Sequence, residues 1–236
     1  MKVITCLSWY NESPAMLAAC ISSVAPFTSH LVAVDGAYAF YPDAQPCSPA
    51  DQVTVIRDIA AANGLGVTIH QPKTAWLANE VEKRSFMFRL AEAHAEPNID
   101  WYYIADADEQ VTGLHIDPLP VLANSDHDSG EITYWWHRPH ETPAERPFAT
   151  PLKEQQGIVK FFRAVPGLHV DGAHYRYRAG DGRMLWNPGP GDKPDPPEDL
   201  RAIYVQHRNQ ERDLWRAQEA ATYYERRDAN RIEALA

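Results

Sequence analysis

The chain has 236 residues, of which 44% are hydrophobic, and this is enough to build a well-packed core. Lys and Arg total 22 against 32 Asp and Glu, and the formal net charge of −10 argues against broad electrostatic binding to nucleic acid. We therefore expect one domain, residues 1–236, in which any phosphate group binds to a local basic pocket.

Cysteine usage indicates a reducing compartment. Cys6, Cys20 and Cys47 have no metal-ligand spacing and cannot all pair within one chain, which favours a cytoplasmic setting. The apolar run at the start of the chain stops at Ser8, far short of a signal-peptide core, and no stretch is apolar enough to span a membrane.

The first half of the chain predicts alternating strands and helices. We expect strands over residues 3–7, 30–34, 67–70 and 101–105, and helices over 15–24, 51–63 and 79–94. Ser13 is placed to cap the first helix, and Gly64 to end the second. This rhythm predicts an α/β fold of Rossmann-like type, with a mixed, mostly parallel sheet and helices on both faces.

The second half is richer in proline. Strands are predicted over residues 131–136, 157–163 and 202–205, separated by proline-rich connections at 138–151 and 187–197. Connections of this length are disordered or act as lids, and we interpret 187–197 as a lid. Residues 209–235 predict a long charged helix at the C-terminus.

An acidic motif, Asp106-Ala107-Asp108-Glu109, follows the apolar strand at 101–105. Side chains alternate along a strand, so Asp106 and Asp108 are predicted to project from the same face and to repel each other. Mg²⁺ or Mn²⁺ would compensate their charge and bring in substrate phosphates. The alternative is structural, because Asp is common at strand ends, where it bonds to backbone amides.

Basic residues precede the motif. Lys83 and Arg84 lie near the start of the helix predicted from Asn79, and cations there face the positive end of the helix dipole. A bound diphosphate would compensate them, whereas the alternative is a surface ion pair between Glu80 and Arg84.

Together these features resemble the nucleotide-sugar glycosyltransferases of the GT-A fold, nearest to the family-2-type group. The likeness rests on the apolar first strand that runs into Tyr10-Asn11-Glu12, the second strand that ends at Asp35, the basic helix and the acidic motif. It covers the first half well and the second half loosely. It implies that residues 1–112 bind the nucleotide sugar and that residues 113–236 bind the acceptor and end in the C-terminal helix.

The resemblance also implies roles for individual residues. Ser8 and Tyr10 would line the nucleobase, Asp35 would bond to the base or ribose, and Asp106 would meet the ribose and a metal-bound water. The implied nucleotide-sugar site consists of Ser8, Tyr10, Asp35, Lys83, Arg84 and Asp106. The implied site for Mn²⁺ or Mg²⁺ consists of Asp106, Asp108 and His207, although a single histidine at a strand-helix junction is slightly more often only hydrogen-bonded.

The expected reaction is metal-dependent transfer of a sugar from a nucleoside diphosphate donor, a UDP-sugar, to a hydroxyl-bearing acceptor. Protein, glycan, lipid and small-molecule acceptors all remain open. If the reaction inverts the anomeric centre, Asp171 or Glu141 is the expected base, and His174 would contact the sugar or the metal. The alternatives are a sugar nucleotidyltransferase, which would carry a glycine-rich loop after the first strand, and a non-enzymatic carbohydrate-binding module.

Overall fold

The computed structural model describes residues 1–41, 45–77, 79–137, 153–172, 176–186 and 195–208, together with 222, 225 and 226. The helices are α1 (Pro14–Val24), α2 (Ala50–Ala62), α3 (Asn79–Ala91) and α4 (Pro118–Ala123), with 3-10 turns η1 (Ala25–Phe27) and η2 (Glu92–His94). The strands are β1 (Val3–Ser8), β2 (His30–Val34), β3 (Gly66–His70), β4 (Trp101–Asp106), β5 (Glu109–Leu114), β6 (Ser129–His137), β7 (Lys153–Arg163), β8 (His169–Val170), β9 (Tyr177–Arg178), β10 (Met184–Trp186) and β11 (Glu198–His207).

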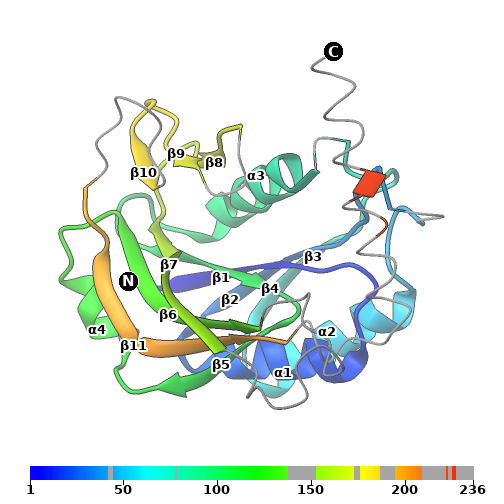
Figure 1. The fold of residues 1–236 in the computed structure, drawn as a ribbon, viewed down its shortest axis with the longest axis horizontal. Helices are drawn as coiled ribbons and strands as arrows, with labels where there is room; N and C mark the ends of the chain where they lie inside the picture. Colours follow the sequence, from blue (N-terminus) through cyan, green and yellow to red (C-terminus); the bar gives the residue numbers. More distant parts are fainter. Residues whose placement is uncertain are drawn as a thin grey trace.

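Eight strands form one curled sheet in the order β3-β2-β1-β4-β7-β6-β11-β5, and β10-β9-β8 form a smaller sheet (Figure 1). The first four strands of the large sheet run parallel to one another. Strand β7 is antiparallel to β4 and β6, while β11 is parallel to β6 and antiparallel to β5. The predicted α/β class with a mixed, mostly parallel sheet is confirmed.

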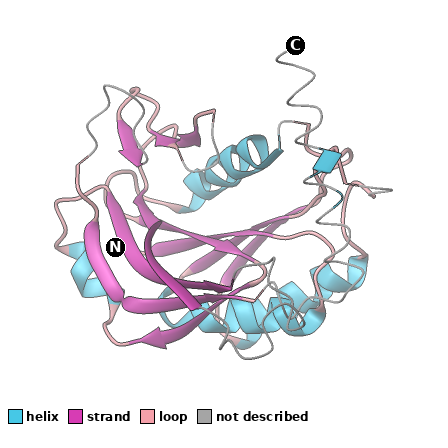
Figure 2. Ribbon diagram, in the orientation of Figure 1, coloured by secondary structure: helices cyan, strands magenta, loops and turns pink. Residues whose placement is uncertain are grey.

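Helices cover both faces of the parallel strands, as predicted (Figure 2). On one face, Val3 and Leu7 of β1 pack in a core cluster with Leu17 of α1. On the other face, Ile4 of β1 packs in a second cluster with Phe88 of α3. Strand β1 is therefore buried on both sides, which explains its continuous apolar run.

Two predicted helix ends are confirmed. The Ser13 side chain accepts a hydrogen bond of 3.2 Å from the backbone N–H of Met16, which caps the start of α1. Gly64 follows α2 with a φ of +69°. The N–H of Leu65 then donates to the carbonyl of Ala60 at 2.9 Å, so the last turn of the helix closes around this glycine.

Other predicted boundaries were wrong or incomplete. Helix α3 ends at Ala91, and the predicted residues 92–94 form the separate turn η2. Strand β11 covers ten residues rather than the predicted 202–205. Strand β5, helix α4 and the small sheet were not predicted. Strand β5 matters most here. The acidic motif was predicted to continue one strand, but β4 ends at Asp106 and the new strand β5 begins at Glu109.

Several predictions fall on residues outside the described ranges. These are the C-terminal helix at 209–235, apart from residues 222, 225 and 226, and most of the proline-rich connections at 138–151 and 187–197. Within the described ranges, no helix is both long enough and apolar enough to cross a membrane.

A pair of histidines joins β2 to η2. The rings of His30 and His94 stack with centroids 3.7 Å apart, and each Nε2 lies within 3.0 Å of the Thr68 hydroxyl. Lys2 donates from Nζ to the carbonyl of His94 and also pairs with Asp100 at 3.5 Å. Burial, His94 and Lys2 together lower the pKa of His30 below its ordinary value.

This arrangement predicts a loss of stability in mild acid. The unfolded chain takes up a proton at His30 near the ordinary histidine pKa of about 6.5, whereas the folded protein resists protonation. The contribution of His30 is therefore fully present above that pH and is lost as the pH falls through its lowered pKa. We expect the free energy of unfolding, measured in urea, to fall less between pH 7.5 and pH 5 for His30→Gln than for the wild type. If the free energy of unfolding falls as much for His30→Gln as for the wild type, His30 is not the cause of the acid sensitivity. His115→Gln, which changes an exposed histidine, serves as the control.

Candidate functional site

The candidate site lies at the carboxyl ends of β1 and β4. From β1 the chain moves outward to β2 and β3, then returns to add β4 on the other side of β1. In parallel sheets such a reversal of strand order leaves a crevice beyond the carboxyl ends of the two central strands. Ser8 and Asp106 are register partners there, so the acidic motif begins at this point of the sheet.

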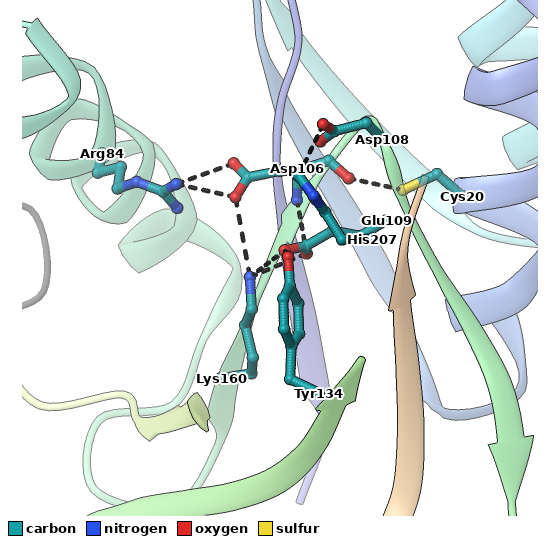
Figure 3. Close-up of polar contacts among 8 residues, drawn as sticks. All are labelled: Cys20, Arg84, Asp106, Asp108, Glu109, Tyr134, Lys160 and His207. Atoms are coloured by element: carbon teal, nitrogen blue, oxygen red, sulfur yellow. Dashed lines mark hydrogen bonds and ion pairs between the residues drawn. The ribbon is translucent and has the colours of Figure 1, made fainter. Parts of the chain in front are cut away.

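Asp106, the last residue of β4, is held by two cations. One guanidinium nitrogen of Arg84, from α3, lies 2.9 Å from both carboxylate oxygens, and the Lys160 ammonium, from β7, lies 3.8 Å from one of them. Figure 3 shows the two cations pointing at Asp106 from different sides. Burial would raise the pKa of Asp106, but the charges of Arg84 and Lys160 outweigh it and hold the pKa below its ordinary value.

Glu109 forms the deeper part of the same cluster. Its carboxylate accepts two hydrogen bonds from Lys160, at 2.7 and 2.8 Å, and one from the Tyr134 hydroxyl at 2.9 Å. A fourth comes from the backbone N–H of Asp106 at 3.1 Å. Burial raises the pKa of Glu109, whereas the charges of Glu109 and Asp106 overcome the effect of burial on Lys160 and raise its pKa. The pair is thus a buried ion pair that ties β7 to the motif.

Asp108 points to a different partner. Strand β4 ends at Asp106, and Ala107 and Asp108 form a turn before β5. The Asp108 carboxylate lies 2.8 Å from Nε2 of His207, at the end of β11, and its backbone carbonyl accepts a hydrogen bond from the N–H of Arg208. The prediction that Asp106 and Asp108 share one face of a strand was therefore wrong, because the strand stops between them.

The three acidic side chains of the motif thus have partners within the protein. Arg84 and Lys160 neutralise Asp106, Lys160 also neutralises Glu109, and His207 contacts Asp108. The charge compensation that the sequence predicted comes, for Asp106 and Glu109, from Arg84 and Lys160. Among the residues that the structure describes, no three His, Cys, Asp or Glu side chains gather closely enough to hold a metal ion.

Two of the three predicted metal ligands nevertheless meet. Asp108 and His207 offer a carboxylate oxygen and an imidazole nitrogen, a donor pair that suits Mn²⁺. Their separation of 2.8 Å is close to the spacing of neighbouring donors around one ion, about 3 Å for donors that each lie about 2.1 Å from it. Asp106 does not join them, since Arg84 occupies both of its oxygens. The donor types therefore fit a divalent ion, and Asp106 would complete the set only on release from Arg84.

Asp35, predicted to contact the base or ribose, is fully buried. Its carboxylate accepts hydrogen bonds from the Gly36 N–H, from both the N–H and the hydroxyl of Ser48, and from the Gln71 amide, at 2.6 to 3.0 Å. A ligand would contact this carboxylate only by displacing one of these donors. The observed arrangement instead uses Asp35 to fix Ser48 and Gln71 at the ends of β2 and β3.

Lys83 contacts the backbone just beyond the carboxyl ends of β1 and β2. Its ammonium donates to the carbonyls of Trp9 and Gly36, at 2.7 and 3.0 Å, and lies 5.5 Å from the centre of the Tyr38 ring. These three contacts place the ammonium of Lys83 next to the carboxyl ends of β1 and β2. Tyr10 is also buried, and its ring meets the edge of another aromatic ring, that of Tyr41, at 5.6 Å.

Of the three second-half residues predicted for catalysis, Asp171 is not brought into the cluster by any contact the structure describes. Asp171 lies beside the small sheet, where it pairs with Arg178 at 3.0 Å and Arg176 at 3.9 Å. Glu141 and His174 fall outside the described residues.

Sequence reasoning missed two main members of the cluster, Lys160 and Tyr134, and assigned Glu109 no role. The sequence did carry a signal for Lys160, because this lysine interrupts an apolar run in β7. In the structure its side chain is buried, with 5% exposed. A charged residue in such a run indicates a buried partner. Tyr134 carries no comparable signal, since an aromatic residue on a strand is ordinarily a core residue.

Comparison with protein-family models gave no match, and comparison with curated proteins gave none either. The functional argument therefore rests on the residues and their geometry.

Proposed function

We propose that this chain is a GT-A-type glycosyltransferase that moves a sugar from a nucleoside diphosphate donor, a UDP-sugar, to a hydroxyl-bearing acceptor. The observation that carries the proposal is the buried cluster of charges at the carboxyl ends of β1 and β4, where the strand order reverses. Nucleotides bind at this place in open α/β sheets because loops and helix ends converge there.

The charges at this edge suit a diphosphate. Arg84 and Lys83, from neighbouring positions of α3, bring two cations to the crevice, and Lys160 brings a third from β7. Cations placed where a diphosphate departs lower the barrier by stabilising the charge that builds on the leaving group. Because all three side chains are at least nine-tenths buried, their charges are less screened than those of surface lysines.

The proposed cofactor is Mn²⁺ or Mg²⁺, held by Asp108 and His207, with Asp106 as the third candidate. When bound, a divalent ion supplies further neutralisation of the departing diphosphate. The contact of 2.8 Å between Asp108 and His207 holds both donors in place beforehand. Glu109 and Lys160 act behind them by fixing the turn that carries Asp108.

The candidate residues for deprotonating the acceptor lie in the second half of the chain. Asp171 remains a candidate base, although two arginines already pair with it, and it would have to give up at least one of them to take a proton. Glu141 and His174 remain candidates from the sequence alone.

The test is a panel of nucleotide sugars incubated with the protein and Mn²⁺, with free nucleotide measured over time. We expect release of UDP from at least one UDP-sugar, by transfer to added acceptors or slowly to water, and suppression of that release by EDTA. Calorimetric titration of UDP should show tighter binding with Mn²⁺ than without it.

The alternatives give different results. A sugar nucleotidyltransferase would make pyrophosphate from a nucleoside triphosphate and a sugar phosphate. A carbohydrate-binding module would bind glycans without metal-dependent binding of UDP. Absence of both UDP release and metal-dependent UDP binding would refute the proposal.

A further inference from the structure

The pairing of Arg84 with Asp106 is incomplete on the arginine side. A single nitrogen, Nη2, bonds to both carboxylate oxygens at 2.9 Å, instead of two nitrogens bonding in parallel. Figure 3 shows this contact, and among the residues that the structure describes the buried Nε of Arg84 has no hydrogen-bond partner. A guanidinium normally binds an oxyanion through two parallel N–H groups, so this contact leaves buried donor capacity unused.

A second cation, Lys160, also compensates the negative charge of Asp106. Lys160 lies 3.8 Å from the same carboxylate, and the Asp106 side chain is 28% exposed, whereas that of Arg84 is 8% exposed. Asp106 is therefore partly accessible to solvent and keeps a nearby cation, Lys160, if Arg84 leaves. Arg84 without Asp106 would be a buried cation lacking its anion, which is a costly state.

We propose that Arg84 exchanges partners when the site fills. In the free protein Arg84 occupies both oxygens of Asp106. When a divalent ion and a nucleoside diphosphate arrive together, Asp106 turns to the ion and Arg84 turns to the diphosphate, where its Nε also finds an oxygen. This inference rests on the proposed function and adds a rule for the site, namely that metal and diphosphate bind well only as a pair.

The energetic reason is that each ligand alone completes only half of the exchange. A divalent ion alone must take Asp106 from Arg84 and leave the guanidinium without the carboxylate that it hydrogen-bonds, with Glu80 as a weaker source of negative charge. A diphosphate alone must draw Arg84 away and leave Asp106 with Lys160 as its remaining described cation. Together they satisfy both groups, and the factor by which each raises the affinity of the other must be the same.

The test measures binding of Mn²⁺ directly, by the electron paramagnetic resonance signal of the free ion, with and without UDP. Arg84→Met removes the charge and leaves Asp106 accessible. We expect this variant to bind Mn²⁺ alone more tightly than the wild type, by about tenfold, and to show little further gain when UDP is added. In the wild type, UDP should raise the affinity for Mn²⁺ by about the same tenfold or more.

Two further variants serve as controls for this test. Arg84→Gln removes the charge but keeps an N–H donor for Asp106, so it preserves the fold if Arg84→Met does not, and it should change Mn²⁺ affinity in the same direction. Arg89→Met removes an exposed cation from the same helix and should behave like the wild type.

The outcomes separate this inference from the proposed function. If the wild type binds Mn²⁺ and UDP cooperatively but the Arg84 variants bind Mn²⁺ no more tightly and keep that cooperativity, the exchange is wrong and the function stands. If the wild type binds neither ligand in any combination, both are wrong.

Discussion

Replacing Lys160 by methionine is expected to lower the free energy of unfolding by about 3–5 kcal/mol, the usual effect of removing one partner from a buried ion pair. Lys160 is the cation that Glu109 and Asp106 share, at 2.7 and 3.8 Å. Without it, the hydrogen bonds that Glu109 keeps from described residues are those from Tyr134 and from the backbone N–H of Asp106. Those neutral donors do not offset a charge that is only 4% exposed.

Urea unfolding of single and double variants measures this effect. Lys160→Met combined with Glu109→Gln removes both charges, so it should recover at least half of the stability that Lys160→Met loses. Lys73→Met, on an exposed loop, should change the free energy of unfolding by less than about 0.5 kcal/mol. A double variant as unstable as the sum of its two single variants would show that charge pairing is not the cause.

Replacing Asp108 by asparagine should reduce UDP-sugar turnover by about 100-fold or more, an effect comparable to the loss of a charged group that acts on the transition state. Asparagine keeps the size of the side chain and can still accept a hydrogen bond from His207. The contact of the Asp108 carbonyl with the N–H of Arg208 is also retained, since it is made by the backbone. The fold should therefore survive while the affinity for a divalent ion falls.

Turnover and thermal unfolding should be measured together for this variant. We expect a small change in melting temperature beside the large loss of turnover, and Asp58→Asn, on the exposed face of α2, should match the wild type in both. Turnover by Asp108→Asn equal to that of the wild type would remove Asp108 from the proposed metal site.

The parallel half of the fold could be predicted from the sequence because local signals there agree with the tertiary structure. The apolar run of β1 is buried on both faces, and Ser13 and Gly64 end their helices through contacts within a few residues. Strand β5 could not be recognised in the same way. It is short and largely polar, it lies at the edge of the sheet, and β11, its partner there, lies far away in the sequence.

The candidate site could be located from the sequence but its internal contacts could not. The sequence placed the acidic motif at the carboxyl end of a strand, and in the structure Asp106 ends β4 beside Ser8 of β1. The partners of the acidic motif come from positions 84, 160 and 207, and a local pattern says nothing about such distant pairs. The sequence therefore did not predict that Arg84 and Lys160 pair with the acidic motif, and the metal stays a prediction.

The decisive experiment is a crystal of the protein soaked with Mn²⁺ and UDP, with data collected at the manganese absorption edge. We expect one manganese peak bound by Asp108 and His207, with the diphosphate of UDP on the same ion and Arg84 turned toward it. UDP or manganese bound elsewhere, with Asp106 still paired with Arg84 and Asp108 still in contact with His207, would refute the proposed site.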